Sequence, residues 1–344
     1  MNILSNHNIT NSLKINSKCR FFIEIDKVTQ FENLHKFINE QNLPVLVIGE
    51  GTNIVPKDYF EGIVIKPTFN KVQYNTNEST VSVGSSVNWH SFVKEMIENK
   101  IYGFENLSLI PGSVGASPIQ NIGAYGQEVS NLIAKVDCFD YVKNKFLSLS
   151  NSDCNFSYRK SSLKDKPYII FNIDFITNGF KSLNLEYDSI QNYIKNNNIN
   201  LSSISLNRAS EIIVDIRNSI LPDPSQVPNV GSFFKNPTIN KNEINTSKFN
   251  LEDLIIWHHD SDIVKVGAAR LIQLVKNDLK NFNNVSIYSN HALVLITNGK
   301  ATQKEILSFA NNIKNVINKT FNISLDIEPT VINLLCFFGQ QSHI

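Results

Sequence analysis

Residues 103–128 read GFENLSLIPGSVGASPIQNIGAYGQE, a stretch with five glycines, two prolines and almost no charge. Glycine permits positive φ and a close approach of the backbone to a ligand, and proline fixes the turns between such positions. An isolated glycine-rich stretch is more often a compact surface loop of turns, but the length of this one favours a ligand cradle. Its backbone N–H groups could hold an anion such as a diphosphate without lysines. The glycines concerned are Gly112, Gly115, Gly123 and Gly126.

A second glycine loop supports this interpretation. Residues 43–55 read LPVLVIGEGTNIV, in which Gly49-Glu50-Gly51-Thr52-Asn53 separates two apolar runs. The pattern predicts a strand, a tight turn and a second strand. The spacing is not G-x-G-x-x-G and no helix opens after the glycines, so a Rossmann dinucleotide site is a poor fit, and a P-loop is absent. We therefore expect a non-Rossmann flavin or nucleotide fold in which two loops clasp one diphosphate.

Composition limits the class of protein. The chain has 344 residues, 42% hydrophobic residues and a formal net charge of +1, which predicts two or three globular domains without bulk attraction for nucleic acid or anionic membranes. The first twenty residues lack the apolar core of a signal peptide, and no apolar run is long enough to span a membrane. Without a C-x-x-C pair, neither a zinc site nor a disulfide framework is indicated. We expect a cytoplasmic protein without a metal site, whose reduced packing cysteines are Cys19, Cys138, Cys154 and Cys336.

Periodicity suggests how the chain is organised. We expect strands at 21–25, 81–85, 133–142, 168–177, 291–297 and 331–338, and helices at 29–42, 88–99, 207–217, 265–277 and 302–319. The first helix carries its apolar stripe on Phe31, Leu34, Phe37 and Ile38. The proline-rich LPDPSQVP at 221–228 cannot continue a helix, so a new region begins there.

Seven motifs stand in a fixed order along the chain: VLVIGEGTNIV (45–55), GSSVNWHSFV (84–93), the whole of 103–128, CNFSYRKSSLK (154–164), LPDP (221–224), VGSFFKNP (230–237) and LDIEP (325–329). In this order and at similar spacing, they resemble the UDP-N-acetylenolpyruvoylglucosamine reductases, or MurB proteins. The most specific pieces of the resemblance are IPGSVGASPIQNIGAYG and GSFFKNP. LEYDSI (185–190) resembles the tyrosine-bearing insertion of the type I branch.

The resemblance implies an α+β architecture in which a two-subdomain, non-Rossmann FAD-binding fold of the PCMH or vanillyl-alcohol-oxidase type precedes an α/β substrate-binding domain. The implied domains are 1–70, joined by the returning tail 329–344, then 71–222 and 223–328. The residues implied to bind FAD are Gly49, Glu50, Gly51, Thr52, Asn53, Ile54, Pro111, Gly112, Ser113, Gly115, Ala116, Ser117, Ile119, Gln120, Asn121, Gly123, Ala124, Tyr125, Gly126 and Arg217. Covalent attachment of the flavin would need a histidine or cysteine in 103–128, which has neither, so we expect non-covalent FAD.

The resemblance also implies the chemistry. NADPH reduces FAD, and flavin N5 then gives hydride to C3 of the enolpyruvyl ether of a UDP-sugar. Arg159 is the expected partner of the charge that develops on the substrate carboxylate, because a guanidinium holds a carboxylate through two hydrogen bonds. Glu328 is expected to share that charge, and Ser232 to protonate C2, where positioning outweighs its weak acidity. Outside these motifs, Arg159, Glu328 and Ser232 would be interpreted as a surface arginine, a solvated acid and a turn-stabilising serine.

Substrate recognition is expected from Tyr187, Lys235, Asn236 and His291. The chain departs from the family pattern at Ile220, where a lysine usually precedes LPDP, and at Arg270, Asn283-Asn284 and His291. These departures concern the substrate region and leave the flavin loops intact. The alternatives are another oxidoreductase or oxidase of the same flavin fold, and an inactive binding protein, which would be expected to lack one of the three catalytic candidates. The expected partners are the enolpyruvyl UDP-sugar and NADPH, with no nucleic acid, membrane or obligate protein partner.

Overall fold

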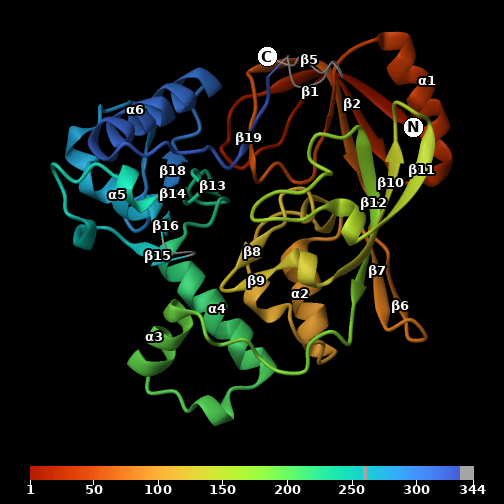
Figure 1. Ribbon diagram of the computed structural model, residues 1–344. Helices are drawn as coiled ribbons and strands as arrows, with labels where there is room; N and C mark the ends of the chain where they lie inside the picture. The colour runs from red at the N-terminus through yellow and green to blue at the C-terminus, as the bar shows by residue number, and fades with distance from the viewer. Residues whose placement is uncertain (259–261, 334–344) are drawn as a thin grey trace.

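A computed structural model describes residues 1–258 and 262–333 (Figure 1). The first region is a sheet in the order β1-β2-β5-β3, formed by β1 (Asn2–Asn8), β2 (Lys18–Ile25), β5 (Tyr59–Pro67) and β3 (Val45–Val47). β1 is antiparallel to β2, whereas β2 and β3 run parallel to β5. The helix expected at 29–42 is α1 (Phe31–Gln41), preceded by a 3₁₀ turn at Val28–Gln30. It ends at Asn42, whose left-handed backbone (φ 48°) returns an N–H to Ile38 O.

The middle region is a five-stranded antiparallel sheet in the order β11-β10-β12-β7-β6. One face packs against α2 (Trp89–Glu98), whose side chains Trp89, Phe92 and Met96 are fully buried. Asn88 caps this helix by accepting the N–H of Ser91. The strands are β6 (Val72–Asn75), β7 (Thr80–Gly84), β10 (Ile133–Asp140), β11 (Lys145–Ser150) and β12 (Tyr168–Ile176).

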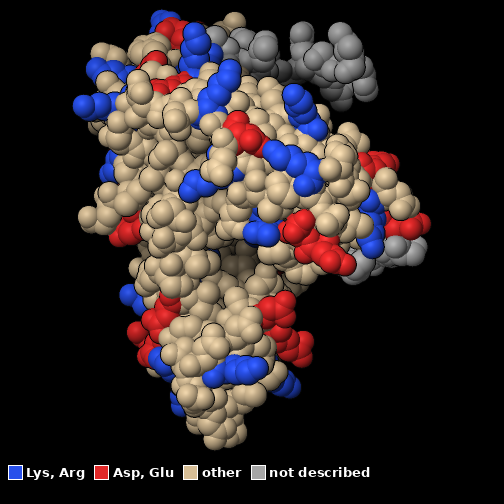
Figure 2. Space-filling model, turned by 90° about the vertical axis from the view of Figure 1, so that its left-hand side faces the viewer, with Lys and Arg blue, Asp and Glu red and all other residues tan. Residues whose placement is uncertain are grey.

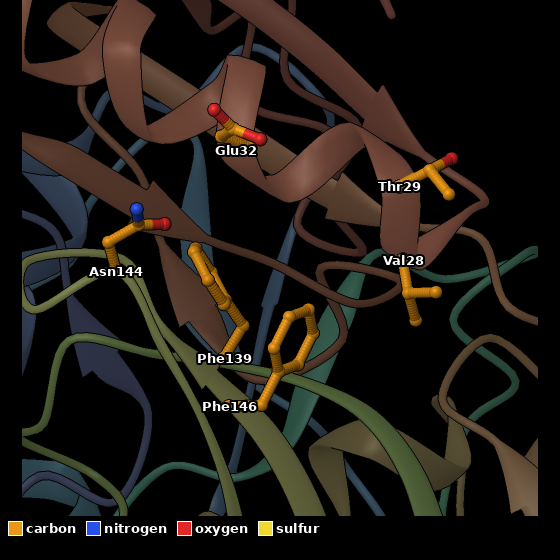
Figure 3. A pocket seen from close by; sticks show the side chains of 6 residues that line it. All are labelled: Val28, Thr29, Glu32, Phe139, Asn144 and Phe146. Carbon is orange, nitrogen blue, oxygen red and sulfur yellow. The ribbon is translucent and has the colours of Figure 1, made fainter.

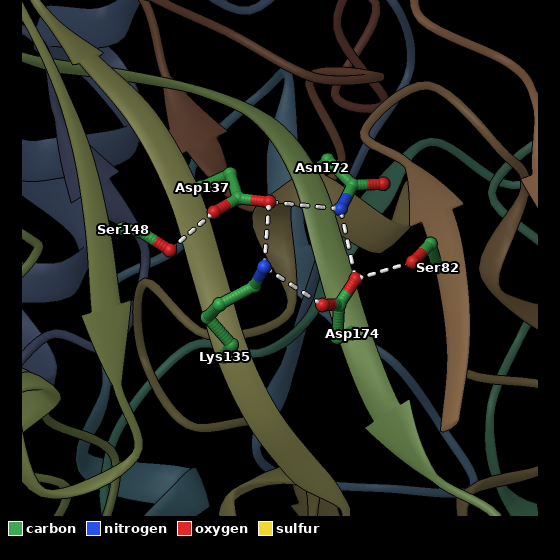
Figure 4. Close-up of polar contacts among 6 residues, drawn as sticks. All are labelled: Ser82, Lys135, Asp137, Ser148, Asn172 and Asp174. Atoms are coloured by element: carbon green, nitrogen blue, oxygen red, sulfur yellow. Dashed lines mark hydrogen bonds and ion pairs between the residues drawn. The ribbon is translucent and has the colours of Figure 1, made fainter. Parts of the chain in front are cut away.

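Part of the other face of this sheet is polar (Figure 4). Lys135 Nζ lies 3.1 Å from Asp174 Oδ2 and 3.5 Å from Asp137 Oδ2, and Asn172 Nδ2 donates to both carboxylates. The Ser82 and Ser148 hydroxyls complete the network from the two outer strands drawn there. Four neighbouring strands are thus joined by side chains that leave no carboxylate unpaired, which explains how charged residues are tolerated on a partly covered sheet.

The rest of that face meets α1. Phe31 stacks on Phe139 with ring centroids 4.5 Å apart, so the first helix and the second sheet share one apolar cluster. A groove of about 450 Å³ lies at this junction (Figure 3). None of the expected site residues lines it; its walls are Val28, Thr29, Glu32, Phe139, Asn144 and Phe146.

Two helices follow the middle sheet. The helix expected at 207–217 is longer, α4 (Leu206–Ile220), and is capped by Ser205. α3 (Asp188–Asn196) was not expected, because only Ile190 and Ile194 of its residues are buried and its apolar signal is weak. The two helices pack together around Ile190, Ile194, Ile212, Ile213 and Ile216, away from the sheets (Figure 1).

The C-terminal region holds two small sheets and two helices. One sheet has the order β13-β18-β17, with β13 (Asn229–Ser232), β18 (Val294–Thr297) and β17 (Val285–Ile287); the other has β14 (Thr238–Asn240), β16 (Ile263–Val266) and β15 (Ile256–His258). The helix expected at 265–277 begins later and is shorter, α5 (Ala268–Leu274), because the β-branched residues of β16 enter the sheet. Likewise the strand expected from residue 291 begins at Val294. α6 (Gln303–Phe321) matches its expected span, with Thr302 as its cap.

The chain then returns to the first region. β19 (Thr330–Val331) pairs in parallel with β4 (Ile54–Val55), and Ile332 is buried beside Ile9 and Phe22. The expected strand at 331–338 lies mostly outside the described residues. The domain boundaries remain a prediction, since the C-terminal core also includes Leu13, Ile15 and Val55 from the start of the chain.

Two observations concern the membrane-spanning segments and the disulfide framework that the composition argues against. None of the helices in 1–258 and 262–333 is long and apolar enough to cross a membrane. Cys19, Cys138 and Cys154 are buried and free, and burial raises the pKa of the Cys19 and Cys154 thiols to about 11. Cys336 lies outside the described residues.

Candidate active site

The two glycine loops lie against each other. Thr52 Oγ1 donates to Pro111 O at 3.4 Å. A side chain at Gly49 would place its Cβ 2.5 Å from Ser113 Oγ, so only glycine fits there without movement. Gly112 has φ +120°, a conformation that L side chains rarely adopt. We call the 103–128 segment the cradle. The first loop and the cradle therefore form one structure in which a ligand can approach the backbone closely.

The cradle carries strain and unpaired polar atoms. Leu109, Asn121 and Tyr125 are non-glycine residues with φ of 57°, 44° and 48°. Ser117 Oγ is buried without a hydrogen-bond partner in the described part of the chain, as is Ser85 Oγ beside the cradle. Strained backbone and orphaned buried hydroxyls are concentrated at ligand clamps. These features fit a segment built around a large polar cofactor.

Gln120 joins three parts of the chain. Its Oε1 accepts from Asn53 Nδ2 at 2.8 Å, and its Nε2 donates to Glu328 O at 3.1 Å. The first loop, the cradle and the segment bearing Glu328 therefore share one amide side chain. This contact brings the C-terminal catalytic candidate to the predicted flavin loops.

Arg159 and Glu328 form an ion pair. Arg159 Nε lies 3.2 Å from Glu328 Oε1, and about one fifth of each side chain is exposed. Arg159 Nη2 also donates to Gly123 O at 2.5 Å, and a Cβ at Gly123 would meet Arg159 Nη1 at 2.9 Å. Burial raises the pKa of the Glu328 carboxyl above its ordinary value, against the opposing fields of Arg159 and Lys235.

Ser232 ends β13, where it lies opposite Val294. Phe233 and Phe234 run beside the segment that carries Glu328. The Glu328 N–H donates to Phe233 O at 3.0 Å, and Phe234 forms an isolated antiparallel β-bridge with Ile327. Ser232 is half-buried, and no residue in the described ranges hydrogen-bonds its Oγ. The preceding Gly231 has φ +71° with open space at its Cβ position, so conformation and not crowding requires glycine there.

The four substrate candidates come from three segments. The exposed Tyr187 ring packs edge-on against Tyr125, with centroids 5.6 Å apart. Asn236 Oδ1 accepts the N–H of Ala268 at the start of α5, which leaves its amide N–H groups as donors. Lys235 acts on Glu328 through its charge. His291 Nδ1 accepts the N–H of Leu293 at 3.2 Å, and burial lowers the pKa of its imidazole.

Two side chains of this region were missed by the sequence analysis. Lys265 Nζ lies 3.6 Å from the centroid of the Tyr158 ring, and the Arg159 guanidinium lies 5.2 Å from the same centroid. Burial, with Arg159, lowers the pKa of the Lys265 ammonium. Tyr158 adjoins Arg159 in the FSYRKSS motif and could have been singled out, whereas only the β15–β16 hairpin brings Lys265 there.

Arg217 lies on α4 and points toward the cradle side of that helix. Its Nε is buried without a hydrogen-bond partner in the described chain, and after burial Tyr125 of the cradle has the largest effect on the pKa of its guanidinium. Burial lowers the pKa of the guanidinium. An orphaned guanidinium N–H beside Tyr125 fits the expected contribution of Arg217 to cofactor binding.

A buried pair anchors the segment that precedes Tyr187. Glu105 Oε2 accepts the N–H of Gly103 at 2.7 Å and also faces the backbone of Asn184. Asn106 Nδ2 donates to Tyr125 O at 2.8 Å and to Asn184 O at 2.9 Å. The tyrosine-bearing insertion is thereby fixed to the cradle.

The departures from the family pattern have local partners. Ile220 is the last residue of α4 and packs against the α3–α4 apolar cluster. Arg270 Nε donates to Asp253 O at 2.8 Å. The Asn284 amide and backbone N–H both bind the Glu305 carboxylate of α6.

The surface between the C-terminal region and the α3–α4 region is hollowed. Figure 2 shows a hollow on the face where the C-terminal region, above, meets the α3–α4 region, below. In the described ranges, no group of three or more histidine, cysteine, aspartate or glutamate side chains could hold a metal ion.

Comparison with known proteins identifies the family. Residues 20–143 match the model of an FAD binding domain, and residues 223–332 match the UDP-N-acetylenolpyruvoylglucosamine reductase C-terminal domain. The chain is 33% identical to UDP-N-acetylenolpyruvoylglucosamine reductase of Buchnera aphidicola, over 94% of this chain and 96% of that protein. The reductase of Bdellovibrio bacteriovorus is 32% identical over 96% of this chain and 99% of its own. The chain belongs to the UDP-N-acetylenolpyruvoylglucosamine reductase family.

The fold agrees with that membership. The crystal structure of the MurB reductase from Thermus caldophilus superposes with a TM-score of 0.64 at 18% identity, covering 93% of this chain and 95% of that one. These comparisons confirm the predicted family and the predicted α+β class with a non-Rossmann FAD-binding fold. They also confirm the prediction of a flavin-dependent oxidoreductase that uses FAD.

Proposed function

We propose that this chain reduces the enolpyruvyl ether of UDP-N-acetylglucosamine to UDP-N-acetylmuramate, a step of peptidoglycan precursor synthesis, with NADPH as the hydride source. The observation that carries the proposal is the Arg159–Glu328 ion pair, which adjoins both the glycine-rich cradle and the GSFFKNP segment. Reduction of an enolpyruvyl group needs a carboxylate partner, a proton donor and a flavin in one place, and these segments supply candidates for all three.

Bound FAD supplies the hydride-transfer chemistry. The first loop, Gly49–Ile54, and the cradle would hold it, with backbone N–H groups toward its diphosphate. Ser117 Oγ and Arg217 Nε, both buried and unpartnered in the described chain, are donors available to it. Residues 103–128 contain no histidine or cysteine, which supports non-covalent binding.

Arg159 would bind the carboxylate of the enolpyruvyl group. As hydride arrives at C3, negative charge grows at C2 and on that carboxylate, and a guanidinium hydrogen bond strengthens with it. The bond to Gly123 O and the pair with Glu328 fix the guanidinium before the substrate binds, so little reorganisation is needed. Glu328, whose carboxyl pKa is raised by burial, would share the same developing charge, either as a carboxylic acid or through a water molecule bound to its carboxylate.

Ser232 would deliver the proton to C2. Its Oγ has no competing hydrogen bond within the described residues, and its position at the end of β13 is set by the pairing with β18. Proton transfer from a weak acid is feasible because the acceptor at C2 is strongly basic and is held in place.

Tyr187, Lys235, Asn236 and His291 would recognise the UDP-sugar. The tyrosine hydroxyl and the free Asn236 amide N–H groups are donors for diphosphate oxygens, and Lys235 adds charge. The neutral His291 ring can donate through Nε2, since its Nδ1 already accepts from Leu293.

We also propose a cytoplasmic location, where NADPH and UDP-sugars occur and thiols stay reduced. The partners that we propose are the enolpyruvyl UDP-sugar and NADPH. The domain limits 1–70, 71–222 and 223–328 are proposed as well.

The test follows flavin colour without oxygen. The purified protein should be yellow, lose that colour with NADPH and regain it when the enolpyruvyl UDP-sugar is added. UDP-N-acetylglucosamine, which lacks the enolpyruvyl group, is the matched control and should leave the flavin reduced. A reduced protein that the enolpyruvyl compound fails to reoxidise would contradict the proposal.

A further inference from the structure

The segment that leads into α2 lies along the start of the cradle. An isolated antiparallel bridge joins Asn88 to Ser113. Four hydrogen bonds of backbone or indole N–H groups also join the two segments: Val114 N–H to Val87 O (2.8 Å), Gly115 N–H to Ser85 O (2.8 Å), Trp89 N–H to Gly112 O (3.0 Å) and Trp89 Nε1–H to Leu107 O (2.9 Å). The conformation of residues 107–115 is thus set by residues 85–90.

His90 adds a bond of a different kind. Its Nδ1 accepts the backbone N–H of Leu109 at 2.9 Å. An imidazole nitrogen accepts only when it carries no proton, so this contact requires the neutral ring with its proton on Nε2. It is the one bond in this group that a change of pH can remove.

Leu109 is a position where the bond matters. Its φ of +57° is unfavourable for leucine, and Pro111 and Gly112, which face Thr52, follow two and three residues later. A left-handed non-glycine residue persists only when its surroundings hold it. Loss of the His90 acceptor would leave a strained residue with an unpaired N–H directly before the flavin loop.

The surroundings of His90 oppose a positive charge. Burial lowers the pKa of its imidazole, and Lys94 on its own helix and Arg217 on α4 act in the same direction. The start of a helix adds a positive dipole end. Protonation of His90 would place a third cation beside Lys94 and Arg217 as well as breaking the bond to Leu109.

We propose that His90 is a positioning residue for the flavin: its neutral imidazole holds Leu109 and the Pro111–Gly112 turn in the binding conformation, and protonation of His90 weakens flavin binding. The inference rests on the proposed function only in that the cradle binds FAD.

The test measures flavin retention from about pH 7.5 to about pH 4.5, a range that extends well below the ordinary histidine pKa because the pKa of His90 is lowered. Holoenzyme is equilibrated and ultrafiltered at each pH, and free FAD in the filtrate gives the dissociation constant. For the wild type, the constant should rise roughly three- to tenfold as the pH falls, the range for one lost hydrogen bond. This readout needs no turnover.

Two variants separate the bond from other acid effects. His90→Asn places an amide oxygen near the position of Nδ1, an acceptor that does not titrate, and should retain FAD equally at both ends of the range. His90→Leu has no acceptor and should bind FAD more weakly than the wild type at about pH 7.5, with a dissociation constant that does not rise further with the His90 titration. Circular dichroism spectra and thermal midpoints establish that both variants are folded.

Two results would overturn the inference alone: retention by the wild type that does not change with pH, or retention by His90→Asn that falls as steeply as the wild type. Wild-type protein that binds no FAD at any pH would overturn the proposed function and this inference with it.

Discussion

Replacement of Ser232 by alanine tests the proton donor directly. The substitution removes one oxygen atom at a half-buried position. Because no hydrogen bond in the described chain engages that oxygen, the free energy of unfolding should change by less than about 0.5 kcal/mol. The left-handed Gly231 and the pairing of β13 with β18 do not depend on the hydroxyl. A loss of activity would then report chemistry and not folding.

The two half-reactions should respond differently. Flavin reduction by NADPH does not use the proton donor and should stay within about tenfold of the wild type. Reoxidation by the enolpyruvyl substrate should slow by at least about 10²-fold, the lower end for a lost general acid, which corresponds to about 2.7 kcal/mol of barrier.

Anaerobic stopped-flow absorbance of the flavin measures each half-reaction separately. Ser247→Ala, which removes an exposed hydroxyl from the same C-terminal region, is the matched control and should leave both rates unchanged. Equal slowing of both half-reactions in Ser232→Ala would make Ser232 structural. An unchanged reoxidation rate would assign the proton to another donor.

Three further outcomes are expected. Acid or heat denaturation should release FAD into the supernatant, and flavin that stays with the precipitated chain would contradict non-covalent binding. Ile220→Lys should strengthen substrate binding by up to about 1–2 kcal/mol at low salt and by less at high salt, because the lysine stem can still cover the α3–α4 cluster while its charge meets the diphosphate. Ile220→Gln is the uncharged control. Equal substrate affinities of the two variants would exclude a charge effect. Asn106→Ala should raise the KM for the UDP-sugar several-fold, because it frees Asn184 and hence Tyr187. It should also weaken FAD binding, because Asn106 donates to Tyr125 O of the cradle. A KM equal to that of the wild type would show that the anchor of Tyr187 is dispensable.

Much of the local structure follows from local chemistry. The conformations of the glycine loops are properties of a few adjacent residues, so Gly49 and Gly112 could be identified without a structure. The long amphipathic helices α1 and α6 were also predicted close to their observed ends, since their apolar stripes are strong and a clear signal ends or begins each one.

Short elements depended on their neighbours. α3 was missed because few of its residues are apolar, and its two buried side chains, Ile190 and Ile194, are covered by α4. The expected helix at 265–277 began too early, since pairing of β16 with β14 and β15 overrides the helical pattern at its start.

The family, the flavin class and the residue types of the site follow from contiguous motifs, so they could be predicted before the fold was known. Which of these residues meet depends on the tertiary structure. Arg159 and Glu328 lie far apart in the chain, and their ion pair exists because the C-terminal segment returns past Gln120 to the first loop. The approach of Lys265 to Tyr158 and the bond from Leu109 to His90 are likewise invisible to local pattern. Local motifs fix backbone conformation and chemical type, whereas distances between segments come from burial of a shared core, a property of the whole chain.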